Sequence, residues 1–105
     1  MQDLIDTIEA AFEARAEITP TNVTATVRDA VQQALALLDA GTARVAEPTA
    51  GGWRVNEWLK KAVLLSFRIA DNAVMDGGFG RFFDKVPTKF ADFGAADFAA
   101  QGARV

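Results

Sequence analysis

One predicted helix, from Asn56 to about Ala70, limits how this chain can fold more than any other feature. Apolar residues cover well over half of its circumference: Trp58, Leu59, Ala62, Val63, Leu65, Phe67 and Ile69. A helix this apolar is normally packed on more than one side. We therefore expect it to lie at the centre of the fold, with Asn56 capping its first turn.

Two amphipathic helices are predicted before this central helix. The first runs from Gln2 to about Arg15, because its apolar residues Leu4, Ile5, Ile8 and Phe12 recur at spacings of three and four. The opposite face carries Asp3, Asp6, Glu9, Glu13 and Glu17, and we interpret it as solvated. The helix should stop before Pro20, because the residue preceding a proline disfavours helical backbone.

The second helix is expected to begin at Thr21 or Asn22, since either side chain can accept a hydrogen bond from the free amides of a first turn. Its apolar stripe is Val23, Val27, Val31, Ala34, Leu35 and Leu38. Gly41 provides the C-terminal stop. A short connection between two such helices predicts an antiparallel pair.

Between Ala43 and Val55 the apolar residues no longer recur at helical spacing. This segment predicts a short β-hairpin with a turn at Gly51-Gly52. Two strands alone are marginally stable, so this hairpin should contact a helix or another part of the chain. We expect Trp53 to be its packing anchor rather than a platform for a ligand.

The segment after the central helix is rich in glycine and phenylalanine. Six of the eight phenylalanines lie here, at Phe79, Phe82, Phe83, Phe90, Phe93 and Phe98. Leaving several exposed is costly, so we expect some to pack on the central helix and some to face a partner. Ala73 to Met75 should be extended, and Asp76 to Gly80 a loop. A short terminal helix should begin near Asp92 or Ala95, carry Phe90, Phe93 and Phe98 on one side, and end at Gly102.

These elements predict one mainly helical α+β domain over residues 1–105. It has three principal helices, a hairpin between the second and third, and a Gly/Phe-rich C-terminal segment.

The net charge of −3 argues against a nucleic-acid binder. No apolar run is long enough to span a membrane, and the acidic N-terminus is unlike a signal peptide, so we expect a cytoplasmic protein.

The residues offer no catalytic or metal-binding constellation. Histidine and cysteine are both absent, which removes the commonest general base and the thiolate nucleophile. Ser66 has no histidine to activate it, and Asp92 and Asp97 have ordinary surroundings. The glycine loop lacks the spacing of a phosphate-binding motif, so we do not interpret it as one.

A cationic strip on the central helix gives a further hypothesis. Lys60, Lys61 and Arg68 could meet an anionic phosphate such as that of coenzyme A. The interpretation that we favour is a solvated strip, or local pairing with Glu57.

Long strings in the sequence resemble a known enzyme family. They are WLKKAVLLSFRI, RFFDKVPTKFADF, AFEARAEITP and DAGTARVAEP, and together they extend over essentially the whole chain. The chain resembles the N-terminal domain of the tetrahydrodipicolinate N-succinyltransferases. The resemblance implies a part in succinyl transfer from succinyl-CoA to tetrahydrodipicolinate, in lysine and diaminopimelate biosynthesis.

The resemblance also implies partners outside these residues. The family's enzymes are homotrimers whose left-handed parallel β-helix carries the acyl-CoA groove, and no hexapeptide repeat of that kind occurs here. We therefore expect an excised N-terminal domain that packs on the β-helix domain and on neighbouring subunits. Succinyl-CoA would be the co-substrate of the full enzyme, and this stretch alone would bind no cofactor and be inactive.

One substrate-binding residue follows from the resemblance. The family has a substrate-binding arginine in a Gly-x-Arg-Val sequence at the end of this domain, and Gly102-Ala103-Arg104-Val105 matches it. Tetrahydrodipicolinate is a dicarboxylate, and a guanidinium can bind a carboxylate with two hydrogen bonds.

An alternative to the function as an enzyme domain is a stand-alone interaction module whose Phe-rich surface binds another protein.

Overall fold

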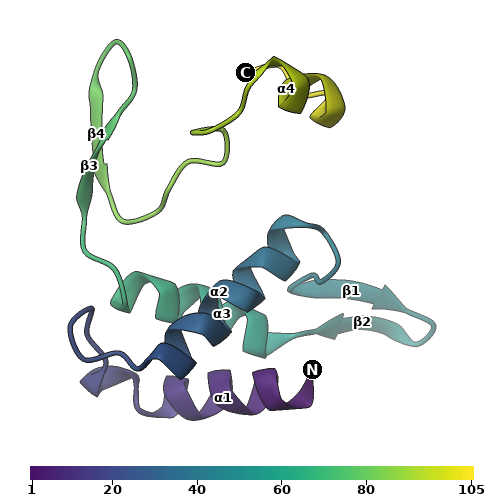
Figure 1. Ribbon diagram of the computed structural model, residues 1–105. Helices are drawn as coiled ribbons and strands as arrows, with labels where there is room; N and C mark the ends of the chain where they lie inside the picture. The colour runs from purple at the N-terminus through teal and green to yellow at the C-terminus, as the bar shows by residue number, and fades with distance from the viewer. The chain divides into compact units, whose positions relative to one another are not determined.

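The computed structural model describes all residues from 1 to 105 and divides the chain into two compact units. The helical unit, Met1–Asp71, contains α1 (Gln2–Glu13), η1 (Arg15–Glu17), α2 (Ala25–Asp39), β1 (Ala46–Thr49), β2 (Gly52–Val55) and α3 (Glu57–Arg68) (Figure 1). The hairpin unit, Asn72–Val105, contains β3 (Ala73–Asp76), β4 (Arg81–Asp84) and α4 (Ala95–Gln101). The predicted α+β, mainly helical class is confirmed.

The core of the helical unit lies where α1, α2 and α3 meet, and each of these helices packs against the other two. Its buried residues are Ile8, Ala11, Ala30, Val31, Ala34, Leu59, Ala62, Leu65 and Ile69. Four of them are alanines, whose small side chains let the helix backbones approach closely. The prediction that the third helix packs on more than one side is confirmed, since α3 contacts both α1 and α2.

The first helix ends at Glu13, slightly earlier than predicted, and η1 continues the chain to Glu17. Asn22 then closes the connection to α2. Its Oδ1 accepts from the backbone N–H of Thr19 at 2.8 Å, and its Nδ2 donates to the carbonyl of Glu17 at 2.7 Å. Because the Asn22 side chain is used within the loop, it does not cap the second helix.

The start of α2 corrects the sequence prediction of Thr21 or Asn22. The helix begins at Ala25, and Thr24 Oγ1 accepts from the N–H of Val27 at 3.2 Å. Thr24 itself has extended backbone, as an N-cap residue should. The stretch offers several residues able to cap, and the geometry of the loop determines which one does.

Strands β1 and β2 form the predicted hairpin, which projects from one end of the helical unit in Figure 1. The turn lies at Ala50 and Gly51 rather than at Gly51 and Gly52. Gly52 already pairs with Thr49, and its φ of +126° is a conformation that favours glycine. Pro48 belongs to β1, opposite Trp53.

Asn56 joins this hairpin to α3, which corrects the prediction that its side chain caps the helix. It occupies the N-cap position without a capping hydrogen bond. Its Nδ2 instead donates to the carbonyl of Arg44 at 2.7 Å and to Glu47 Oε1 at 3.1 Å. Glu47 is also paired with Arg54, whose Nη2 lies 2.6 Å from Oε1. These contacts fix the polar face of the hairpin against the beginning of α3.

The prediction for Trp53 is wrong. Its side chain is 74% exposed, so it does not anchor the hairpin. Residues on one face of a strand alternate, which places Trp53 with Val55, Pro48 and Ala46, and all four are exposed. On the opposite, polar face, Glu47 accepts a hydrogen bond from Asn56, which occupies the N-cap position of α3.

In the hairpin unit, β3 confirms the predicted extended piece and pairs antiparallel with β4. The second hairpin was not predicted. Its loop is closed by a hydrogen bond of 2.9 Å from the N–H of Gly77 to the carbonyl of Gly80. A Cβ on Gly77 would collide with the ring of Phe82 unless that ring shifted, and Gly78 has a φ of +80°, a conformation that favours glycine.

The terminal helix α4 begins at Ala95 and stops at Gly102, whose φ is +75°, as predicted. Asp97 accepts from the N–H of Gly94 at 2.8 Å and so caps the first turn. Phe90 and Phe93 precede the helix rather than lying on it. Their rings nevertheless form a small aromatic cluster with that of Phe98, in which the three pairs of ring centroids are 4.9 to 5.6 Å apart.

Candidate functional site

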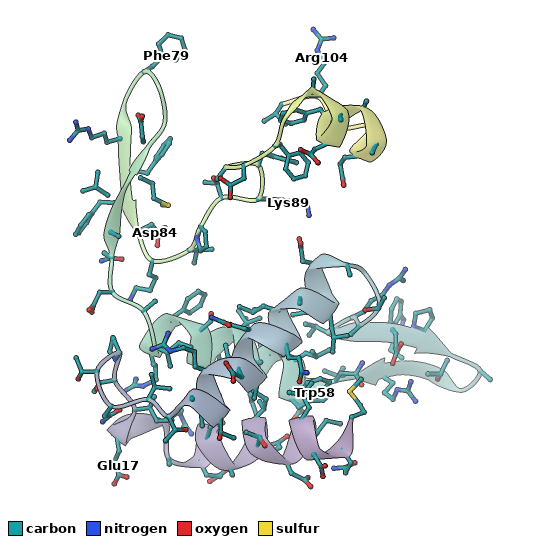
Figure 2. The ribbon with its side chains drawn as sticks, in the orientation of Figure 1. Glu17, Trp58, Phe79, Asp84, Lys89 and Arg104 are labelled. Carbon is teal, nitrogen blue, oxygen red and sulfur yellow. The ribbon has the colours of Figure 1, made fainter.

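Arg104 lies two residues beyond Gly102, where the left-handed backbone ends α4. In Figure 2 its side chain points away from α4 into open space. The residue is exposed, and neither of the ion pairs found, Arg54–Glu47 and Lys61–Glu9, involves it. Its guanidinium is therefore available to a ligand carboxylate, which it can bind through two parallel hydrogen bonds.

The hairpin unit also holds exposed aromatic side chains. Phe79 is fully exposed at the loop between β3 and β4, where Figure 2 shows it pointing outward. Phe82 and Phe83, on opposite faces of β4, are 56% and 69% exposed. A two-stranded ribbon with aromatic residues on both faces gains stability by packing on another surface.

Of the cationic strip on α3, Lys61 has a structural partner. Its Nζ donates to Glu9 Oε2 at 2.5 Å and lies 5.4 Å from the centre of the Phe12 ring. This hydrogen bond, with smaller contributions from Glu57 and Glu13, raises the pKa of Lys61 against the opposing effect of partial burial. The sequence suggested Glu57 as the local partner, but the hydrogen-bonded carboxylate comes from α1.

The other two members of the strip differ from each other. Arg68 Nη2 reaches the carbonyl of Ala16 at 3.5 Å, so its side chain extends toward η1. Lys60 is exposed. Two of the three cations therefore contact the segment formed by α1 and η1, and a phosphate site built from all three stays a prediction.

Other residues considered from the sequence have local structural roles. Ser66 donates its hydroxyl hydrogen to the carbonyl of Val63 at 2.6 Å, within its own helix. Asp97 caps α4, as described above, and Asp76 accepts from the N–H of Gly78 at 3.1 Å.

No group of three or more histidine, cysteine or acidic residues is arranged to hold a metal ion. None of the helices is both long and apolar enough to cross a membrane.

The structure reveals one surface feature that the sequence did not indicate. A groove in the helical unit is lined by Phe12, Arg15, Leu64, Leu65, Phe67 and Arg68. Arg15 comes from the beginning of η1 and Arg68 from the end of α3. The two arginines are 53 positions apart in the sequence, so no spacing rule could have brought them together.

Comparison with known proteins matches the whole chain. The family model described as tetrahydrodipicolinate N-succinyltransferase N-terminal matches residues 3–69. A 2,3,4,5-tetrahydropyridine-2,6-dicarboxylate N-succinyltransferase from Alkalilimnicola ehrlichii is 61% identical over 105 residues, which are 100% of this chain and 39% of that protein. Proteins of the same name from Sodalis glossinidius and Nitrosospira multiformis are 61% and 55% identical, again over all 105 residues and 38% of their length.

The chain thus spans about two fifths of the length of the curated relatives that it matches. The family model includes all three core helices and the β1–β2 hairpin. The resemblance found in the sequence is confirmed. This chain belongs to the tetrahydrodipicolinate N-succinyltransferase N-terminal domain family.

Proposed function

We propose that this chain serves as the N-terminal part of an enzyme that transfers a succinyl group from succinyl-CoA to tetrahydrodipicolinate, in lysine and diaminopimelate biosynthesis. The observation that carries the proposal is 61% identity over every residue of the chain to a protein named for that reaction. The chain itself contains no nucleophile and base in contact. It would therefore be inactive alone, and the acyl-transfer chemistry would belong to the part of the relatives that it does not span.

The physical role of the chain would be to pack on the part of the enzyme that it does not span. The family resemblance implies that this part is a left-handed β-helix. The exposed aromatic side chains of Phe79, Phe82 and Phe83 support this role, since a partner surface would remove them from water. Neighbouring subunits of a homotrimer would be the second contact. A cytoplasmic location is part of the same proposal.

Within this function Arg104 would bind a carboxylate of the substrate. Its exposure and its position after the end of α4 support this role, because the guanidinium can meet a ligand without breaking an existing ion pair. A charge-assisted bidentate contact in a closed site would hold the dicarboxylate and set its orientation.

A chimaera tests the proposal. Residues 1–105 would replace the matching N-terminal region of the Alkalilimnicola ehrlichii relative, and release of free coenzyme A would be followed with a thiol reagent. We expect the chimaera to turn over and the 105-residue chain alone to release none. Arg104→Ala should lower kcat/KM by about 10- to 100-fold, as expected for loss of a hydrogen-bonded ion pair with substrate.

Arg44→Ala is the matched control, because Arg44 is exposed and lies in the helical unit before β1. An inactive chimaera that folds and assembles like the relative would refute the proposed function. An active chimaera with the same kcat/KM in both variants would refute only the role of Arg104.

The exposed phenylalanines of the hairpin unit also favour the second candidate function, a stand-alone interaction module. This function predicts that the chain is inactive in any chimaera and that Phe83→Ser weakens binding of a partner protein. Because the same side chains support both functions, the activity of the chimaera distinguishes them.

A further inference from the structure

The groove between the ends of α1 and α3 combines an apolar floor with two cationic side chains. Leu65 is buried beneath it, while Leu64 and Phe67 are 39% and 42% exposed at its sides. Its volume is about 300 Å³. A space of this size accepts one large apolar side chain, and its exposed sides suit a group presented by another surface better than an enclosed small molecule.

Each of the two arginines contacts a backbone carbonyl. Arg15 Nη1 donates to the carbonyl of Phe12 at 2.8 Å, and its guanidinium carbon lies 4.1 Å from the centre of the Phe12 ring. Arg68 Nη2 reaches the carbonyl of Ala16 at 3.5 Å. A guanidinium has five N–H donors, so each arginine keeps several for a further acceptor.

The charge of these two arginines is not matched by a carboxylate in the structure. The ion pairs found join Arg54 to Glu47 and Lys61 to Glu9. The nearby Lys61 is therefore already paired, whereas Arg15 and Arg68 hydrogen-bond only to main-chain oxygens. The two guanidinium groups beside the apolar groove are therefore without a carboxylate partner.

We propose that this groove binds a peptide segment of a partner protein in which a large apolar side chain is flanked by carboxylates. The apolar side chain enters between Phe12 and Leu64, and the carboxylates accept hydrogen bonds from Arg15 and Arg68. Charge complementarity selects this partner, because a neutral apolar segment would leave both guanidinium groups without an anion. The proposal rests on the helical unit alone and does not depend on succinyl transfer.

Three short peptides test the proposal with the 105-residue chain, by amide chemical shifts in NMR titrations. Acetyl-Asp-Phe-Asp-amide carries both elements, acetyl-Asn-Phe-Asn-amide lacks the charges, and acetyl-Asp-Ala-Asp-amide lacks the ring. We expect saturable shifts at Phe12, Arg15, Leu64 and Arg68 with the first peptide, at a Kd of about 1 mM. The other two peptides should bind at least about tenfold more weakly, since each loses one of the two contributions.

The variant Arg15→Gln/Arg68→Gln should reduce binding of the first peptide to the level of the neutral one, and Arg44→Gln should leave it unchanged. Equal binding of the charged and neutral peptides would overturn the proposal, as would shifts centred elsewhere or no saturable shift up to about 20 mM. The comparison between peptides uses the unaltered chain, so the proposal stays testable even if the double variant does not fold.

Discussion

The Nζ of Lys61 on α3 donates a hydrogen bond to Glu9 Oε2 on α1 at 2.5 Å, across 52 positions of the sequence. The lysine side chain is 24% exposed and the glutamate side chain 40% exposed. The Nζ of Lys61 also lies 5.4 Å from the centre of the Phe12 ring, so the residue combines an ion pair with a cation–π contact at the α1–α3 interface.

The first prediction concerns alkaline pH. The hydrogen bond to Glu9 raises the pKa of Lys61 above its ordinary value of 10.5. The contribution of this pair to stability is therefore complete below the unfolded pKa and is lost as pH rises through the higher folded pKa. Urea unfolding across the alkaline range should show a steeper loss of stability in the unaltered chain than in Lys61→Met. Lys60→Met is the control, and an identical loss in both variants would contradict the prediction.

Acid pH should act on a different residue. The side-chain hydrogen bond from Arg54, and then the one from Asn56, lower the pKa of Glu47 below its ordinary value of 4.5. The stabilising contribution is present above the unfolded pKa and is lost as pH falls through the lower folded pKa. Side-chain NMR of Glu47 should report the lowered midpoint, and Arg54→Met should move it upward. A midpoint that stays unchanged in Arg54→Met would show that the ion pair does not form in solution.

The cap of α2 gives a third prediction. Thr24→Ala removes the hydroxyl that accepts from the N–H of Val27, and it should destabilise the helical unit by about 1 kcal/mol. Thr24→Ser keeps the acceptor and should retain most of the stability. Thr21→Ala tests the alternative cap expected from the sequence. A larger loss in Thr21→Ala than in Thr24→Ala, measured by chemical denaturation, would mean that the helix starts earlier than the structure shows.

Two neighbouring leucines on α3 allow a matched test of packing. Leu65 is 1% exposed and Leu64 is 39% exposed. Leu65→Ala leaves a cavity between the three helices and should cost about 2 to 5 kcal/mol, whereas Leu64→Ala should cost much less. Thermal unfolding followed by circular dichroism compares them. Similar midpoints for the two variants would mean that α3 is rotated about its axis relative to the structure.

The helices of this protein could be predicted because their signals are local. Leu4, Ile8 and Phe12 repeat at the period of a helix, and Gly41 and Gly102 supply left-handed backbone near helix ends. The caps could not be predicted as well, because Thr21, Asn22 and Thr24 are all capable of the role. The strand Arg81–Asp84 was missed, because its sequence does not alternate between apolar and polar residues.

The sequence by itself determined the family, the helical class and the position of Arg104, since each depends on residue identity and order along the chain. The tertiary structure alone determined that Glu9 meets Lys61, that Trp53 lies exposed, and that Arg15 and Arg68 border one groove. The physical reason is that these relationships depend on how α1, α3 and the first hairpin are rotated and packed. Small alanine side chains and many weak contacts distributed through the core set that packing, and no short motif encodes it.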